Sequence, residues 1–379
     1  MTKDILFFDF KRKYRQNRNA IQRAISSVFE RGWFILGPEL ERFEHNFAQY
    51  LKVPYAVGVN SGTDALYLAL RALGVGKGDE VITVSHTATP TISAIRLTGA
   101  IPVFVDIDAD TYNMDVRKIE PKITSRTKVI LPVHLYGYPA DPAAIMRVAK
   151  KHGLKVVEDA AQATGAYYRG KLAGTIGDIG CFSFYPTKNL GAFGDGGAIA
   201  TRDKKLADTV RALRNYGEVS KFNNRIEGTN SRLDELQASL LSWSLTKLKG
   251  WNKKRERLAS LYLKELRGLP LKLPPAKGAG KVPAWHLFVI RTARQEECDA
   301  LRKFLAERGV GTMVHYPTPV FAQKAYSFLH YTSKDLPVTS AVATTIVSLP
   351  LYPELTVIEV KTVCRNIKLF YDRHYGRKR

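Results

Sequence analysis

The chain has 379 residues, of which 45% are hydrophobic and 25% are charged, values typical of an ordinary soluble globular protein. Its 58 lysine and arginine residues exceed its 35 acidic residues, so the formal net charge of +23 favours anionic partners. Apart from short clusters at Lys11–Arg15, Lys253–Arg257 and Arg377–Arg379, the basic residues are spread along the chain. This spread speaks against a dedicated nucleic-acid-binding surface.

Three cysteines, Cys181, Cys298 and Cys364, lie far apart and lack the spacing of metal ligands. They indicate a protein of the reducing cytoplasm without a disulfide framework, and we expect no metal site. The first sixteen residues contain a five-residue apolar patch that Asp9 interrupts. We therefore expect neither a signal peptide nor a membrane span there.

Apolar residues at helical spacing alternate along the chain with short buried runs. The predicted helices cover 14–31, 38–51, 65–74, 90–99, 141–153 and 203–217. The predicted strands cover 55–60, 81–85, 101–108, 128–134, 155–160 and 180–184. This alternation predicts an α/β protein with a mostly parallel central sheet and helices on both faces.

The second half of the chain begins with a polar, aperiodic stretch, residues 218–229. A long helix is predicted next, with Ser231 as its N-cap and leucines on one face. Beyond a loop rich in proline and glycine, residues 285–291 and 311–316 are predicted strands that flank a helix at 296–308, and a last helix covers 356–372. We expect a large domain at 14–250 and a small α+β domain that consists of residues 251–379 together with the N-terminal segment 1–13.

A carboxylate and a lysine follow two of the predicted strands. Asp159 ends the strand VVED, and Lys188 lies just past GCFSF. Pyridoxal phosphate (PLP) chemistry needs such a pair: the lysine forms a Schiff base with the aldehyde, and the carboxylate keeps the pyridine nitrogen protonated. A strand-end Asp and a nearby Lys are also common in α/β proteins without this cofactor.

A phosphate site is predicted at Ser61-Gly62-Thr63-Asp64, which opens a helix directly after a strand. Small residues there expose backbone N–H groups at the positive end of the helix dipole. Simple N-capping is the alternative. Because ligands of parallel sheets lie beyond the carboxyl ends of the strands, Thr63, Asp159 and Lys188 should meet at one edge. The glycine run at 191–201 lacks the order of a nucleotide loop and is interpreted as a tight turn into a strand.

Several motifs together resemble the DegT/DnrJ/EryC1/StrS family of PLP-dependent sugar aminotransferases, which have the aspartate aminotransferase fold (fold type I). The resemblance covers nearly the whole chain and is carried by GPELERFEHNFAQYL, NSGTDAL, VEDAAQATG, FSFYPTKNLG with GDGGA, LRNYG, NSRLDELQAS and SLPLYPELT.

The resemblance implies roles for individual residues. Lys188 resembles the lysine that binds the cofactor and later moves a proton between the amino acid Cα and the cofactor C4′. Asp159 resembles the partner of the pyridine nitrogen, and Gln162 the residue on the cofactor's phenolic side. The remaining cofactor contacts resemble phosphate ligands: Gly62, Thr63, Ser183 and, from the neighbouring subunit of a homodimer, Asn230.

The sequence departs from the family pattern in two places. Where many members carry an aromatic residue that stacks on the cofactor, this chain has Ala88, and His86 is the expected substitute or a structural histidine. Phe321 replaces a histidine that many members have after the HYPxP motif. The sugar contacts of that loop are therefore not predicted.

The resemblance implies an aminotransferase that moves an amino group from L-glutamate to a nucleotide-linked keto-deoxysugar. The run YPTKNLGAFGDGG favours a dTDP-3-keto-6-deoxyhexose, and a 4-keto nucleotide sugar is the alternative. A regulatory or nucleic-acid-binding protein on the same fold is the rival from another class. The chain shows no nucleic-acid-binding motif, so we expect neither a nucleic acid nor a membrane as partner.

Overall fold

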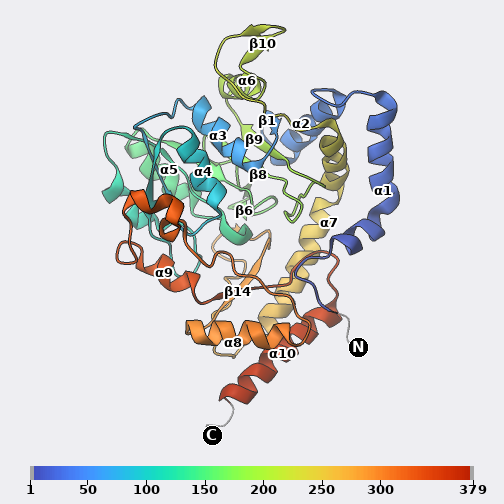
Figure 1. Cartoon of the computed structure of the whole chain (residues 1–379), viewed down its shortest axis with the longest axis vertical. Helices are drawn as coiled ribbons and strands as arrows, with labels where there is room; N and C mark the ends of the chain where they lie inside the picture. The colour runs from blue at the N-terminus through green and yellow to red at the C-terminus, as the bar shows by residue number, and fades with distance from the viewer. Residues whose placement is uncertain (1–3, 376–379) are drawn as a thin grey trace.

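Seven strands form the central sheet of the computed structural model, which describes residues 4–375 (Figure 1). The sheet is parallel except at β9, which pairs antiparallel with both of its neighbours. All five residues of β2, β8 and β9 are buried, as expected for strands covered on both faces. In spatial order the strands are β1 (Tyr55–Val59), β9 (Gly197–Thr201), β8 (Ile179–Ser183), β5 (Lys155–Asp159), β4 (Thr127–Ile130), β2 (Glu80–Val84) and β3 (Ile101–Val105).

The sheet separates two apolar cores. Successive residues of β8 alternate between them: Cys181 lies in one core and Phe182 in the other. Helix α3 fills the first core, and α2 and α7 fill the second. The prediction of helices on both faces is thus confirmed. The helices around the sheet are α1 (Phe10–Arg31), α2 (Pro38–Leu51), α3 (Gly62–Ala72), α4 (Thr89–Leu97), α5 (Pro142–Lys151), α6 (Lys204–Leu213) and the first part of α7 (Glu235–Glu265).

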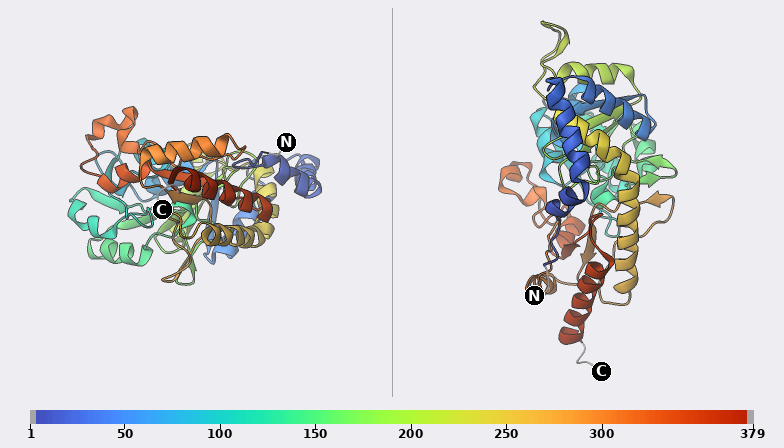
Figure 2. Two further views of the ribbon diagram at one scale, coloured as in Figure 1. Left: turned by 90° about the horizontal axis from the view of Figure 1, so that it is seen from below. Right: turned by 90° about the vertical axis from the view of Figure 1, so that its right-hand side faces the viewer.

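A third core lies at the opposite end of the molecule from the hairpin of β10 (Glu218–Ser220) and β11 (Asn223–Asn224) (Figures 1 and 2). It is built by the second part of α7 and by the elements of the last hundred residues, and Ile5 from the N-terminal segment packs into it. Its helices and strands are α8 (Gln295–Ala306), α10 (Val357–Tyr375), β13 (Phe288–Arg291) and β14 (Ile346–Leu349). Helix α9 (Pro337–Ala343) packs against the first core instead.

The predicted division into domains at position 250 falls inside α7, which continues without a break into the third core. Val320 and Phe321, from the predicted small domain, pack into the first core. The division therefore stays a prediction.

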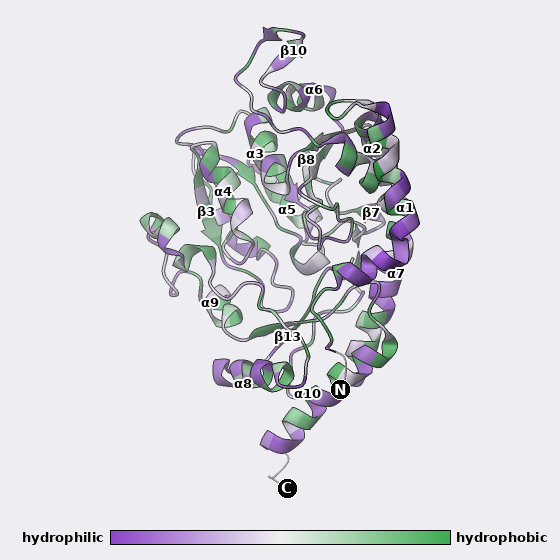
Figure 3. Ribbon diagram, turned by 45° about the vertical axis from the view of Figure 1, so that its right-hand side comes forward, coloured by the Kyte–Doolittle hydropathy of each residue, from purple (hydrophilic) through white to green (hydrophobic). Residues whose placement is uncertain are grey.

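Figure 3 shows hydrophilic residues along α1, on the outside of the molecule.

Short elements complete the described chain. The strands are β6 (Tyr167–Tyr168), β7 (Lys171–Leu172), β10 (Glu218–Ser220), β11 (Asn223–Asn224) and β12 (Lys281–Val282), and the 3₁₀ helices are η1 (Val116–Lys118), η2 (Glu120–Lys122), η3 (Leu135–Gly137), η4 (Val320–Ala322) and η5 (Lys324–Leu329).

Two local predictions were wrong. Residues 311–316 do not form a strand, because only Met313 pairs there, through an isolated bridge to Ser348. Ser231 does not cap α7, which begins at Glu235 with Asp234 as its N-cap. The Ser231 hydroxyl instead donates to Asp64 Oδ2 at 2.7 Å and accepts the Asn60 N–H at 3.2 Å, and so it ties this segment to the start of α3.

Within residues 4–375, no helix has the length and apolar character needed to cross a membrane.

Candidate active site

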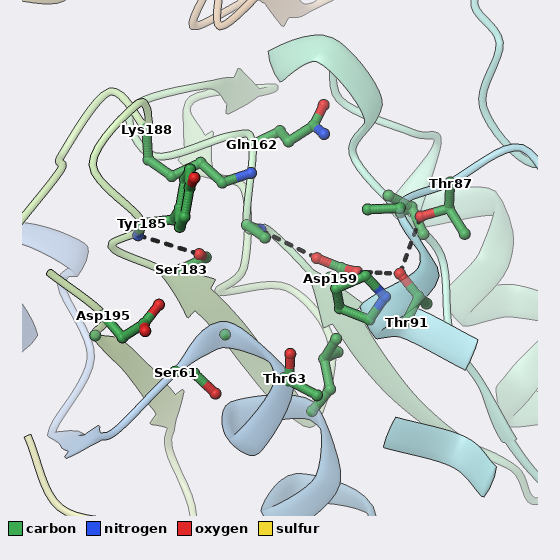
Figure 4. A pocket seen from close by; sticks show the side chains of 17 residues that line it. Ser61, Thr63, Thr87, Thr91, Asp159, Gln162, Ser183, Tyr185, Lys188 and Asp195 are labelled. Carbon is green, nitrogen blue, oxygen red and sulfur yellow. Dashed lines mark hydrogen bonds between the residues drawn. The ribbon is translucent and has the colours of Figure 1, made fainter. Parts of the chain in front are cut away.

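A cavity of about 380 Å³ lies at the carboxyl edge of the sheet, a size that suits a small-molecule ligand (Figure 4). Thr63 comes from the first turn of α3, Asp159 from the end of β5, and Lys188 from the turn after β8. All three line the cavity, as predicted from their places after the strands β1, β5 and β8. Figure 4 shows Lys188 and Asp159 on opposite sides of it.

Asp159 is buried and held at both carboxylate oxygens. Thr91 Oγ1 donates to Oδ2 at 2.9 Å, and the Ala161 N–H donates to Oδ1 at 3.1 Å. Burial raises the pKa of Asp159, while these two donors and the charge of Lys188 oppose the rise. The donors therefore stabilise the carboxylate form in a place where burial alone would favour the neutral acid.

Thr87 adds a second hydroxyl to the hydrogen-bond chain that begins at Asp159 and Thr91. Its Oγ1 lies 2.9 Å from Thr91 Oγ1. Because Thr91 uses its only hydrogen on Asp159, Thr87 must be the donor in this pair. Sequence reasoning missed both threonines, although they stand in the TATPT run that leads from β2 into α4 and lie at the same edge of the sheet as Asp159.

Lys188 belongs to a turn that its backbone N–H closes by donating to the Tyr185 carbonyl at 2.8 Å. Its side chain is partly open to the cavity but otherwise surrounded by protein. This burial lowers the pKa of Lys188 to about 8, and the Asp159 carboxylate opposes the shift. A sizeable fraction of the amine is therefore neutral near pH 8, as a nucleophile or a proton acceptor requires.

A small-residue cradle lies between α3 and β8. A Cβ placed on Gly62 would lie 2.6 Å from Ser183 Cβ, so this close approach requires glycine. The Ser61 hydroxyl accepts the Asp64 N–H at 3.1 Å, which confirms the N-capping alternative for Ser61. The first N–H groups of a helix have no partner within it, and at Gly62 and Thr63 they begin the helix beside the cavity. Together with Ser183, these residues form a cradle suited to a phosphate.

Gln162 also lines the cavity, and two hydrogen bonds fix the orientation of its side-chain amide. Its Oε1 accepts the Tyr136 N–H at 2.7 Å, and its Nε2 donates to the Tyr316 hydroxyl at 3.0 Å. Tyr316 comes from a segment more than 150 residues away in sequence. The contact between Gln162 and Tyr316 could therefore not be predicted from the local sequence pattern.

Two predicted site residues lie outside the cavity. His86 is fully buried, and its Nε2 lies 2.9 Å from the Tyr136 hydroxyl. Burial lowers the pKa of His86 to about 4. The structure therefore corrects the prediction that His86 offers a stacking face: Thr87 and Ala88 line the cavity in its place. Asn230 is exposed and pairs with Asn215 through an isolated bridge, and it does not line the cavity that contains Lys188.

A second cavity, of about 420 Å³, adjoins the first, since Tyr185 lines both. Most of its wall is apolar, and the N-terminal residues Leu6–Phe8 supply part of it. Two imidazoles, His286 and His315, also face it. Burial and the charge of Lys188 lower both pKa values, that of His315 to about 4, so both rings are neutral near pH 7.

Within residues 4–375, we found no group of three or more His, Cys, Asp or Glu side chains arranged to hold a metal ion.

Comparison with known proteins adds independent findings. Residues 15–368 match the model of the DegT/DnrJ/EryC1/StrS aminotransferase family. The chain is 48% identical over 354 residues to a dTDP-3-amino-3,4,6-trideoxy-alpha-D-glucose transaminase of Streptomyces venezuelae, covering 93% of each chain. It is 45% identical to a dTDP-3-amino-3,6-dideoxy-alpha-D-galactopyranose transaminase of Aneurinibacillus thermoaerophilus, covering 97% of this chain and 99% of the relative.

Among solved structures, S. venezuelae DesV in complex with a ketimine intermediate superposes with a TM-score of 0.95 at 46% identity. The superposition covers 98% of this chain and 100% of DesV.

Proposed function

Because the chain belongs to the DegT/DnrJ/EryC1/StrS aminotransferase family, we propose that it moves an amino group from L-glutamate to C3 of a dTDP-linked 3-keto-6-deoxyhexose. The protein is an enzyme, a PLP-dependent sugar aminotransferase. The observation that carries the assignment is the meeting of Lys188, Asp159 and the Gly62–Ser183 cradle in one cavity. The two relatives named above, both transaminases that make 3-amino sugars, support the 3-keto acceptor.

The residues present fit pyridoxal phosphate. Gly62, Thr63 and Ser183 would hold its phosphate through N–H and hydroxyl groups. Gly62 allows α3 to lie this close to Ser183, because a Cβ at position 62 would lie 2.6 Å from Ser183 Cβ. When bound, the cofactor supplies an electron sink that stabilises negative charge on the carbon losing its proton.

Asp159 would hold a proton at the pyridine nitrogen. Its carboxylate must remain ionised to do so, and the Thr91 hydroxyl and Ala161 N–H favour that form against the effect of burial. Gln162, fixed by Tyr136 and Tyr316, would contact the phenolic side.

Lys188 would anchor the cofactor and then move the proton of the amino acid Cα. A base works best when its pKa is near the operating pH, and burial brings the pKa of Lys188 to about 8. The surrounding protein also limits the access of water to this amine.

The second cavity would take the acceptor sugar. It adjoins Lys188 through Tyr185 and Thr187, and its apolar wall suits the deoxygenated carbons of a deoxysugar. The two neutral imidazoles can exchange hydrogen bonds with sugar hydroxyls without adding charge.

A homodimer with shared sites would complete the enzyme. Within the described chain, Lys188 is the one cation that lines the cofactor cavity, which supports a second copy as the source of further groups for an anionic cofactor and substrate. Asn230 is exposed and free to serve a neighbour. An apolar patch at the end of α1 offers an interface: Phe29, Trp33, Phe34 and Ile35 are 61%, 56%, 45% and 40% exposed.

The test is a panel of acceptors supplied with L-glutamate. The 3-keto dTDP-6-deoxyhexoses should give the highest kcat/KM, and the 4-keto isomers should be at least about tenfold poorer, equivalent to 1.4 kcal/mol of transition-state discrimination. Equal or better turnover of the 4-keto isomers would show that the proposed acceptor is wrong. The assignment of the protein as an aminotransferase would not be affected.

A further inference from the structure

A chain of side-chain amides lies behind His286, one of the two imidazoles of the second cavity. His286 is buried, and its Nδ1 lies 3.2 Å from Oδ1 of Asn189, the residue that follows Lys188. In a neutral imidazole either nitrogen can carry the one hydrogen, and the partner of Nδ1 decides which nitrogen does. The direction of this hydrogen bond therefore determines whether His286 Nε2 donates or accepts.

The orientation of the Asn189 amide follows from its other partners. Asn252 Nδ2 donates to the Thr164 carbonyl at 3.1 Å, so the Asn252 atom that faces Asn189 is its oxygen. Asn189 Nδ2 donates to this oxygen at 2.8 Å and to the Ala284 carbonyl at 2.7 Å. Both hydrogens of the Asn189 amide are thus used, and a flipped amide would point its oxygen at two other oxygens.

The remaining polar atom of Asn189, Oδ1, can only accept. His286 Nδ1 must therefore be the donor in their hydrogen bond. Burial, together with the charge of Lys188, lowers the pKa of His286 well below its usual value, so the ring has a single hydrogen near pH 7. That hydrogen is on Nδ1, and Nε2 keeps a lone pair.

His286 Nε2 is open to the second cavity. Within residues 4–375 this atom has no hydrogen-bond partner, and it is not one of the unpartnered polar atoms that the protein buries completely. His286 lines the cavity, whose wall is mostly apolar. A ligand that fills the cavity must offer a hydrogen-bond donor to this lone pair, because leaving the atom unpaired costs free energy.

We propose that Asn189 is a positioning residue that holds His286 as the Nδ1–H tautomer, and that His286 Nε2 accepts a hydrogen bond from a ring hydroxyl of the acceptor sugar. The inference rests on the proposed function, because the acceptor identifies the donor group. In a dTDP-3-keto-6-deoxyhexose the free hydroxyls are at C2 and C4, on either side of the carbonyl. The carbonyl oxygen itself cannot be the partner, since it only accepts.

The tautomer is tested by ¹⁵N NMR of the holoenzyme labelled with ¹⁵N-histidine. Protonated and unprotonated imidazole nitrogens have well-separated ¹⁵N shifts, and His286→Gln identifies the His286 signals among those of eight histidines. Near pH 7, Nδ1 of wild type should be protonated and Nε2 unprotonated. In Asn189→Ala the two shifts should move toward each other, because the acceptor that fixes the hydrogen on Nδ1 is lost. An unprotonated Nδ1 in wild type, or unchanged shifts in folded Asn189→Ala, would overturn the proposal.

The sugar contact is tested with acceptors that lack either the 2-hydroxyl or the 4-hydroxyl. One of the two deletions should lower kcat/KM of wild type at least about fivefold. The same deletion should lower kcat/KM of His286→Asn less than about twofold, because Asn keeps a donor near the place of Nδ1 but has no atom at the place of Nε2. His286→Gln, which can put an amide oxygen there, should discriminate like wild type.

The control variant is His45→Asn, which changes an exposed histidine on α2 and should discriminate like wild type. The sugar contact is overturned if each hydroxyl deletion lowers kcat/KM by the same factor in wild type and in His286→Asn. Failure of the proposed function is a different result: wild type would then aminate none of these sugars. The NMR measurement would still decide whether Asn189 fixes the His286 tautomer.

Discussion

Burial shifts the two ionisable groups of the cofactor cavity in opposite directions. It lowers the pKa of Lys188 to about 8 and raises the pKa of Asp159. Each charge opposes the shift of the other, because a nearby opposite charge favours the ionised form. The Lys188 charge therefore favours the carboxylate form of Asp159, and the Asp159 charge favours the ammonium form of Lys188.

The pKa of Lys188 can be tested in the cofactor-free protein. The neutral amine is the reactive form, so the labelling rate of Lys188 by an amine-reactive reagent should rise with pH and reach half its maximum near pH 8, against about 10.4 for an ordinary lysine. Asp159→Asn should move this midpoint to lower pH, since the opposing carboxylate is lost. Mass spectrometry of the labelled peptide gives the rates, and a midpoint near 10 would show that burial does not control this amine.

Thr91 is expected to position Asp159 and to hold it ionised. Thr91→Val keeps the shape but removes the donor to Oδ2, so the pKa of Asp159 should rise further and kcat should fall by about tenfold, the effect of one charge-assisted hydrogen bond. Thr91→Ser should restore most of the loss. The acid limb of the kcat pH profile should move to higher pH in Thr91→Val only, and an unshifted limb would give Thr91 a purely structural role.

Lys188 and Asp159 could be predicted because each follows a strand of a parallel sheet, where chain order alone places both side chains at one edge. Thr91 and Tyr316 could not, because their roles depend on contacts across 68 and 154 residues. The prediction that His86 offers a stacking face failed for a related reason. The sequence does not show that His86 Nε2 forms a hydrogen bond with the Tyr136 hydroxyl inside the core.

At the scale of elements, the close approach of α3 to β8 shapes the phosphate cradle. Gly62→Ala would bring a Cβ to 2.6 Å from Ser183 Cβ, and such overpacking typically costs about 1–3 kcal/mol. Urea unfolding should show this loss, and cofactor retention on dialysis should fall with it.

Gly76→Ala is the matched control. A Cβ there meets no atom within 4 Å, so its stability should stay within about 0.5 kcal/mol of wild type. If the two alanine variants were equally stable and retained the cofactor equally, the cradle would be wider than the structure shows.

Most helices and strands could be predicted from periodicity, because buried apolar runs dominate this fold. The exceptions are segments where a tertiary contact, rather than the local sequence pattern, determines the secondary structure. Ser231 matches the capping pattern but is bound by Asp64, and the helix starts four residues later. Residues 311–316 alternate like a strand, yet one bridge to β14 is all that forms.

For the whole molecule, the shared site makes a prediction about mixed dimers. Lys188→Ala and Asn230→Asp should each be inactive, the second because its carboxylate repels the cofactor phosphate. In a mixed dimer, one site would combine the intact Lys188 of one chain with the intact Asn230 of the other. Random exchange of equal amounts should therefore restore about a quarter of wild-type activity. Native mass spectrometry would verify exchange, and verified exchange without recovery would mean that each site is built from a single chain.

The most direct test of the central claim follows the transferred nitrogen. The enzyme is given L-glutamate labelled with ¹⁵N at the amino group and a dTDP-3-keto-6-deoxyhexose, and the sugar product is analysed by mass spectrometry. Wild type and Lys205→Ala, which changes an exposed lysine on α6, should produce the ¹⁵N-amino sugar, and folded Lys188→Ala should produce none. Transfer of ¹⁵N by Lys188→Ala at the wild-type rate would contradict the assignment of Lys188 as the catalytic lysine.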